Sequence, residues 1–169
     1  MLSYIESNLL HDEKFVYGVR PHWIVFSSSV WALIFAVICW IYLPQLTSLS
    51  EITVYAGLTV RSFITLLCFL TAIYWMFSAL IYYLTSEYGV TSNRVLIKVG
   101  WIKRISLELI LDKVEGVLVN QSIPGRILNY GTIIIIGTGG TKDQFPFIPN
   151  PMEFRKQVQE QVEVFEKRG

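Results

Sequence analysis

Charged side chains are scarce in this sequence. Asp, Glu, Lys and Arg together make up 16% of its 169 residues, whereas soluble domains usually carry about 25%. Apolar residues make up 53%, and the mean hydropathy is +0.48. The net charge is only +1, so a nucleic-acid partner, which needs a basic surface, is not expected. This composition argues against an ordinary soluble globule and predicts a membrane protein.

Cysteine and histidine are also rare. Cys39 and Cys68 both lie in apolar stretches, which is typical of buried side chains and gives no disulfide or metal framework. His11 and His22 are the only histidines, and no cysteine or acidic pair stands at ligand spacing from them. We therefore expect neither a metal nor a cofactor. The chain does not open on a basic stretch followed by an apolar core, so no cleaved signal peptide is expected.

Two long runs contain no charged residue at all: residues 23–43 and residues 63–84. A helix needs about 20 apolar residues to cross a bilayer core, and both runs are long enough. Aromatic side chains stand near their ends, as in an interfacial belt. We predict two transmembrane helices. The alternative, a hydrophobic hairpin inside a soluble protein, is disfavoured because so short a chain has little else to cover it.

The basic residues predict the orientation of these helices. Two of them precede the first run, only Arg61 lies in the connection at 44–62, and all the others follow the second run. Since Lys and Arg are enriched on the cytoplasmic side, we expect residues 1–22 and 85–169 to be cytoplasmic and the connection to be external. The connection is itself fairly apolar, so a short helix on the outer surface and an extension of the second span both stay open.

After residue 84 the hydrophobic pattern changes to alternation and to β-branched runs, which is typical of strands. The short spacing between turn residues, with no long helix in between, indicates an antiparallel meander. Residues 137–140, although rich in glycine, are followed by another strand pattern, so we predict a hairpin turn there and not a phosphate loop. The predicted strands are 85–91, 94–99, 104–111, 114–121, 131–138 and 143–147.

The last segment reads as one amphipathic helix at about 151–166. Asn150 stands at the cap position, Pro151 at the first helical position and Glu153 three residues after the cap, which together predict a capping box. Apolar side chains then recur at helical spacing. They are Phe154, Val158, Val162 and Phe165. The expected fold class is therefore α+β, with a two-helix membrane hairpin followed by an antiparallel sheet and a closing helix.

Several short motifs carry a family resemblance. They are Thr91-x-Asn93-Arg94, Gly100 before Lys103-Arg104, Leu111-Asp112-Lys113-Val114, Gln121-Ser122, the run from Gly125 to Thr132, and Arg20-Pro21-His22-Trp23 at the start of the first span. With these motifs the chain resembles the membrane-anchored bacterial pleckstrin-homology (PH-like) domain family. The resemblance implies a PH-like barrel or sheet capped by the last helix, in a bacterial inner membrane. A PH fold has seven strands, and only six are predicted after the second span. Either residues 15–20 add an edge strand, or one of the six predicted segments contains two strands.

The meander also predicts which loops lie near the membrane. The first strand leaves the second span, so the loops at 100–104 and 120–131 return toward the bilayer, and both mix basic and bulky apolar side chains, which suits anionic headgroups. The alternative is that Ile127, Leu128 and Tyr130 fill the core and that Trp101 covers it. The candidate lipid or membrane-surface residues are Trp101, Ile102, Lys103, Arg104, Arg126 and Tyr130.

Three functions follow from these predictions. The first is a non-enzymatic, membrane-anchored interaction module that scaffolds a membrane protein complex or a homo-oligomer. The second is an accessory protein that recognises or handles anionic lipids. A transporter subunit or an enzyme is the third and weakest, since the spans hold no charge that would mark a pathway and no nucleophile motif is present. The expected partners are membrane lipids and either a membrane protein or further copies of the chain.

Overall fold

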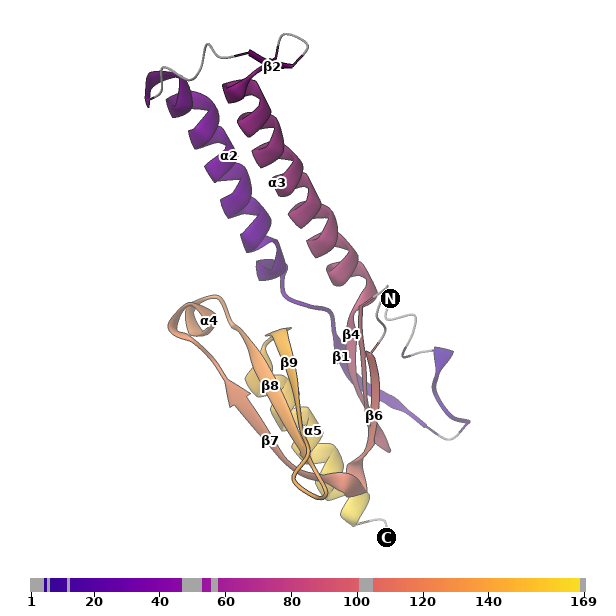
Figure 1. Cartoon of the computed structure of the whole chain (residues 1–169). Helices are drawn as coiled ribbons and strands as arrows, with labels where there is room; N and C mark the ends of the chain where they lie inside the picture. The colour runs from indigo at the N-terminus through magenta and orange to yellow at the C-terminus, as the bar shows by residue number, and fades with distance from the viewer. Residues whose placement is uncertain are drawn as a thin grey trace. The chain divides into compact units, whose positions relative to one another are not determined.

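The structure, a computed structural model, describes residues 5, 7–11, 13–46, 53–55, 58–100 and 105–167. It divides into two compact units (Figure 1). Unit 1 comprises Met1–His22 and Tyr82–Gly169, and unit 2 comprises Trp23–Ile81. The segment before the apolar helices therefore belongs to the same unit as the domain that follows them.

Unit 2 is built from the two apolar runs. A 3-10 helix, η1 (Trp23–Phe26), leads into α2 (Ser27–Leu46), and α3 (Val60–Thr85) begins in unit 2 and ends in unit 1. Two segments, Trp23–Tyr42 and Ser62–Thr85, are long and apolar enough to cross a membrane. Between the helices, β2 (Thr53–Tyr55) and β3 (Leu58–Thr59) form a small antiparallel hairpin. Of the two alternatives left open for the connection, the short surface helix is wrong, since its described part contains this hairpin, while α3 begins at Val60, before the predicted start of the span at residue 63.

Unit 1 contains seven strands among its described residues, arranged in two antiparallel sheets. The first sheet has the order β1-β4-β5-β6, and the second has the order β7-β8-β9. Their bounds are β1 (Phe15–Val19), β4 (Glu87–Thr91), β5 (Arg94–Val99), β6 (Ile105–Ile110), β7 (Val114–Asn120), β8 (Tyr130–Gly137) and β9 (Lys142–Pro149). All six strands expected after the helices are present, with small shifts at their ends. The seventh is β1, which pairs with β4 and confirms that residues 15–20 supply an edge strand.

Hydrogen bonds bring three turns of unit 1 together. A short 3-10 helix, η3 (Leu111–Lys113), links the two sheets. The N–H of Leu111 donates to the carbonyl of Asn93 at 3.0 Å, and the N–H of Thr138 donates to the carbonyl of Lys113 at 3.0 Å. In the turn between β8 and β9, Gly139 and Gly140 have φ values of 85° and 77°, a conformation that glycine adopts without strain. Residues 137–140 therefore form the predicted hairpin turn.

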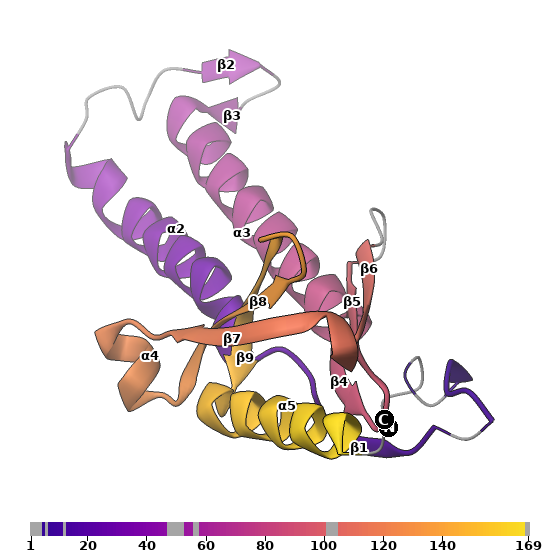
Figure 2. The ribbon, with the colours of Figure 1, turned by 90° about the horizontal axis from the view of Figure 1, so that it is seen from below.

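Both sheets share one hydrophobic core, which α5 (Pro151–Glu166) closes on one side. Figure 2 shows α5 running beside β7, against which it packs. The bounds of α5 are as predicted, but the predicted capping box is wrong. Asn150 is left-handed (φ 45°, ψ 54°) and its side chain makes no cap hydrogen bond, because its Oδ1 accepts from Nδ2 of Asn129 instead. The buried core residues are Tyr88, Val90, Val95, Ile97, Leu111, Val117, Ile133, Ile135, Phe145, Ile148, Phe154 and Val158.

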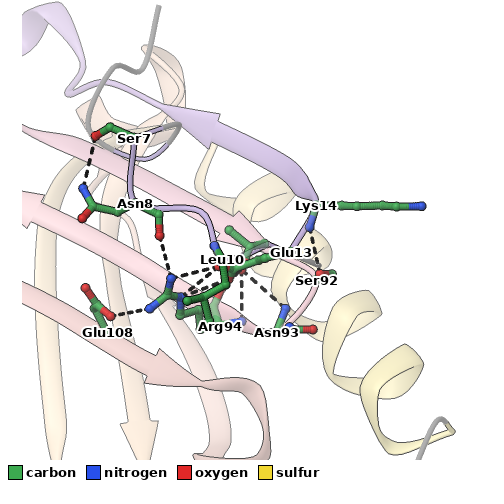
Figure 3. Close-up of polar contacts among 10 residues, drawn as sticks. Ser7, Asn8, Leu10, Glu13, Lys14, Ser92, Asn93, Arg94 and Glu108 are labelled. Atoms are coloured by element: carbon green, nitrogen blue, oxygen red, sulfur yellow. Dashed lines mark hydrogen bonds and ion pairs between the residues drawn. The ribbon is translucent and has the colours of Figure 1, made fainter.

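A buried ion pair fixes the segment before β1 to Arg94, the first residue of β5 (Figure 3). The carboxylate of Glu13, which is fully buried, accepts from Nε of Arg94 at 3.0 Å and from its Nη2 at 2.9 Å. The same guanidinium donates to Glu108 at 2.5 Å and to the carbonyl of Asn8 at 2.7 Å. Burial alone would raise the pKa of Glu13, but hydrogen bonds from Arg94 and Thr91 hold that pKa below its ordinary value.

Ile5 covers the outer face of the first sheet. Tyr88 and Val90 of β4 point into the core, so Glu87 and Gly89, which alternate with them, lie on the opposite face. Ile5 is fully buried there, and a Cβ atom added at Gly89 would stand 2.5 Å from its Cδ1. The N–H of Ile5 donates to Oε2 of Glu87 at 3.4 Å. The lack of a side chain at Gly89 thus makes the space that Ile5 fills.

Candidate functional site

The chain leaves unit 1 at two places, and both lie at the same end of that unit. His22 is the last residue of its first piece, and Tyr82 is the first residue of its second piece. The N–H of His22 donates to the carbonyl of Phe147 at 2.6 Å. The ring of Tyr82 meets the ring of Phe147 edge-on, with centroids 6.2 Å apart. We call the region around His22, Tyr82, Tyr130 and Phe147 the junction end.

His22 also lies against the start of β8. Its imidazole stacks on the ring of Tyr130, with centroids 5.3 Å apart and an angle of 26° between the ring planes. Burial lowers the pKa of His22, and a hydrogen bond to the backbone of Leu128 opposes that shift. Burial therefore favours the neutral imidazole, which stacks on Tyr130 as a flat, partly buried ring.

Phe147 owes its position to a distortion of β9. It has a φ of 61°, and the register between β8 and β9 shifts between Gly131 and Ile133. Such a bulge bends the strand and redirects a side chain. The neighbouring carbonyl of Pro146 accepts from the hydroxyl of Tyr88 at 3.3 Å. The bulge therefore turns the Phe147 carbonyl toward His22 while β9 stays attached to the core.

A short helix, α4 (Ile123–Ile127), is held beside Tyr130. Oγ of Ser122 caps it by accepting from the N–H of Gly125 at 3.2 Å. The amide of Gln121 donates to the carbonyl of Tyr130 at 3.1 Å. A Cβ atom at Gly125 would lie only 2.7 Å from that carbonyl oxygen, so glycine is what allows α4 to approach so closely. These contacts place α4 at the junction end.

Large apolar side chains of α4 point into solvent. Ile123 is 82% exposed and Ile127 is 78% exposed. Residues four apart lie on the same side of a helix, so the two side chains form one apolar ridge. Figure 1 shows α4 in the connection between β7 and β8. Arg126 and Leu128 are exposed beside this ridge. The alternative in which Ile127 and Leu128 fill the core is therefore wrong, although Tyr130 is half-buried.

The structure describes two of the six predicted site residues. Arg126, on α4, and Tyr130, at the start of β8, lie at the junction end. The other four, Trp101, Ile102, Lys103 and Arg104, fall outside the described residues. The residue before them is Gly100, whose N–H donates to Oγ of Ser86 at 3.4 Å. Since Ser86 directly follows α3, the end of β5 also returns to the side of unit 1 where α3 ends.

A small hollow adjoins α4 at the junction end. It has a volume of about 160 Å³. Its lining consists of Asn120, Ser122, Tyr130, Gly131, Thr132, Pro146 and Phe147. Within the described part of the chain, no three histidine, cysteine or acidic side chains are grouped as a metal site. The junction end therefore offers apolar contact and neutral hydrogen-bonding groups, and Arg126 adds a cation beside them.

The described residues form an α+β protein. Two antiparallel sheets surround one core, which a C-terminal helix closes, and a pair of apolar helices is joined to this domain. The family model described as the bacterial PH domain matches residues 24–162, and the chain belongs to this family. The matched segment includes both apolar helices. No curated protein matches the chain.

One similar solved structure is the crystal structure of a DUF1696 family protein with a pleckstrin-homology domain from Shewanella loihica PV-4. The sequence identity is 7% and the TM-score is 0.38. The similarity covers 46% of this chain and 70% of that chain.

Proposed function

We propose that this chain is a membrane-anchored, non-enzymatic interaction module whose PH-like domain contacts the bilayer surface through its junction end. The observation that carries this proposal is the exposed apolar ridge of Ile123 and Ile127, at 82% and 78% exposure. Removing one such side chain from water contributes about 1.5–3 kcal/mol. A bilayer supplies the apolar layer that this ridge lacks.

Chain connectivity supports the same proposal. If the segments Trp23–Tyr42 and Ser62–Thr85 cross the membrane, the residues at their inner ends stand at its surface. His22 directly precedes the first of them, and it stacks on Tyr130, beside α4. The ridge would therefore belong to the part of unit 1 that lies next to the membrane surface.

The basic residues of the two loops would add electrostatic attraction. Arg126 is exposed next to the ridge, and a Lys or Arg close to an anionic surface contributes about 1 kcal/mol. We propose that Lys103 and Arg104 meet lipid phosphates in the same way, and that Trp101 and Ile102 lie at the headgroup level. Apolar insertion and basic contact together make a stronger attachment than either alone.

The pairing of β1 with β4 favours an even number of crossings, because it joins the segments on either side of the apolar helices in one sheet. With the distribution of Lys and Arg, it supports cytoplasmic N- and C-termini in a bacterial inner membrane. Ser48, in the predicted external connection, provides the test. In a Cys39→Ala and Cys68→Ala background, Ser48→Cys should react with a membrane-impermeant maleimide in intact cells. Labelling only after lysis would overturn this orientation.

Lipid contact of the junction end is tested in the full chain, reconstituted in vesicles that contain one-quarter anionic lipid. In the same cysteine-free background, Ile123→Cys or Ile127→Cys carries an environment-sensitive fluorophore. Ile110→Cys is the matched control, because Ile110 is also exposed but lies next to η3. Spin-labelled lipid should quench the fluorophore at positions 123 and 127 and leave it bright at 110. Equal quenching at all three positions would exclude the proposed contact.

Scaffolding of a membrane protein complex or of a homo-oligomer is the second proposed function. It is favoured by an open groove beside the outer strand of the second sheet. Native mass spectrometry of the detergent-extracted protein tests it, since a scaffold should retain a partner or further copies. A bare monomer under gentle extraction would argue against it.

A further inference from the structure

A groove of about 320 Å³ runs between β7 and α5. Its floor is formed by aliphatic side chains, namely Val114, Val117, Val158 and Val162. Its two walls carry one carboxylate each, Glu115 from β7 and Glu163 from α5, and both are exposed. A volume of this size is within the range of sites that bind small molecules or side chains.

The strand beside this groove is an edge. β7 is the outer member of the sheet β7-β8-β9, and its one strand neighbour among the residues that the structure describes is β8. A strand at an edge presents N–H and C=O groups with which another strand can pair. The register of β7 shifts between Val114 and Gly116, and such a bulge opens the strand locally.

Gln159 gives access to the groove from α5. It lines the groove, and its side chain is exposed, so a bulkier side chain at this position reaches the groove without entering the core. Filling the groove at this position should therefore leave the fold intact.

We infer that this groove accepts an extended, basic segment from the cytoplasmic part of another membrane protein, which adds a strand to the outer edge of β7. In strand addition the backbone hydrogen bonds supply affinity and alternate side chains supply specificity. Aliphatic side chains of the segment would pack on the valine floor, while flanking Lys or Arg side chains would pair with Glu115 and Glu163. The inference rests on the proposed anchoring, since cytoplasmic segments next to membrane spans are enriched in Lys and Arg.

The experiment uses the full chain in nanodiscs of phosphatidylcholine alone, so that a basic probe does not bind the lipid. The probe is a fluorescein-labelled peptide of alternating Val and Lys, and binding is followed by fluorescence anisotropy. Gln159→Trp, which fills the groove from α5, and Glu163→Lys, which reverses the charge of one lining carboxylate, should each weaken binding by about tenfold or more. Glu160→Lys changes the charge equally on α5 but does not line the groove, and it should bind within about twofold of the native chain.

Peptides that carry N-methyl groups on one or the other set of alternate residues test the strand addition itself. An added strand turns one edge toward β7 and the other toward solvent, so one methylation pattern should abolish binding and the other should leave it unchanged. Equal behaviour of the two peptides, whether both bind or neither does, would overturn strand addition.

The two proposals fail separately. The double variant Ile123→Ser/Ile127→Ser removes the ridge at the junction end but leaves the groove unchanged, so it should bind the probe as the native chain does. Absence of probe binding to the native chain at about 1 mM, or unchanged binding by both Gln159→Trp and Glu163→Lys, would overturn the inference. A dimer that Gln159→Trp dissociates, without probe binding, would assign the groove to a second copy and overturn the partner named here.

Discussion

The imidazole of His22 stacks on the ring of Tyr130 with centroids 5.3 Å apart, although the pair of apolar helices separates the two residues in the sequence. The N–H of His22 also donates to the carbonyl of Phe147 at 2.6 Å. The last residue before the first apolar helix is therefore held by two strands, β8 and β9, of the second sheet. This contact makes the junction end an ordered part of unit 1.

Tyr130→Ala should destabilise unit 1, because it removes the ring on which His22 stacks and leaves a gap beside α4. We expect the free energy of unfolding to fall by about 2 kcal/mol. The measurement is thermal unfolding of the full chain in detergent, followed by circular dichroism. Tyr130→Phe keeps the stacked ring and should change the midpoint little. If both variants lost the same stability, the hydroxyl and not the stack would be the stabilising group.

Two glycines give a matched pair of substitutions. Gly125→Ala places a Cβ atom 2.7 Å from the carbonyl oxygen of Tyr130, so α4 must move, at a cost of about 1–3 kcal/mol. Gly116→Ala meets nothing within 4 Å and should leave the stability unchanged or raise it by about 0.5 kcal/mol. Denaturant unfolding of the full chain compares them. Equal stability of the two variants would contradict the close packing of α4 on β8.

Much of the fold was predictable because local patterns determine it. The alternation of apolar and polar residues in β6 and the apolar stripe of α5 reflect burial of one face, and the β-branched run in β8 is typical of a strand in any surroundings. The membership of β1 in the first sheet was left open because it depends on pairing with β4, a contact across both apolar helices. The cap position of α5 at Asn150 was right, but the capping box was wrong for a similar reason, since Asn129 takes the side-chain oxygen of Asn150.

The candidate site was less predictable. The predicted meander placed Arg126 and Tyr130 correctly on the side of the domain where α3 ends, because strand order alone determines which loops return to that side. Ile123 was missed because α4 (Ile123–Ile127) is too short to show a helical period. The position of Phe147 depends on a bulge, for which the sequence carries no clear signal. Nothing in the sequence connects Glu13 with Arg94 either, because the ion pair joins segments that only the fold brings together.

Glu13→Gln should destabilise the chain at neutral pH by about 2–4 kcal/mol, because it removes the buried charge that pairs with Arg94. The pKa of Glu13 is lowered in the folded state from its ordinary value of 4.5. The stabilisation by this group is therefore fully present above about pH 4.5 and is lost as the pH falls through the folded-state pKa.

Unfolding of the full chain as a function of pH measures this effect. The difference in stability between the native chain and Glu13→Gln should shrink steadily as the pH falls below 4.5. Glu153→Gln, on the exposed surface of α5, is the control and should show no such trend. A constant difference between the native chain and Glu13→Gln across the acid range would mean that the carboxylate contributes through packing alone.

Arg126→Gln should weaken the attraction of the junction end to anionic lipid while leaving the apolar ridge in place. With a fluorophore at position 127, quenching by spin-labelled lipid should be greater in anionic than in phosphatidylcholine vesicles for the native chain, because a basic residue near an anionic surface contributes about 1 kcal/mol. This difference should be smaller in the variant. Arg155→Gln, exposed on α5, should behave as the native chain does. A full anionic preference in Arg126→Gln would remove Arg126 from the lipid contact.

The ribosome makes β1 before either apolar helix, and makes the strand that β1 pairs with, β4, after both. If the two apolar helices cross a membrane as proposed, the first sheet can be completed only once both helices have been synthesised and the segments before and after them lie in the same compartment. A chain inserted with only one crossing would leave β4 with an open edge and Arg94 without the buried carboxylate of Glu13. Such a chain would expose unpaired strand and charge to proteases and chaperones, so completion of this sheet would distinguish correctly inserted molecules from misinserted ones.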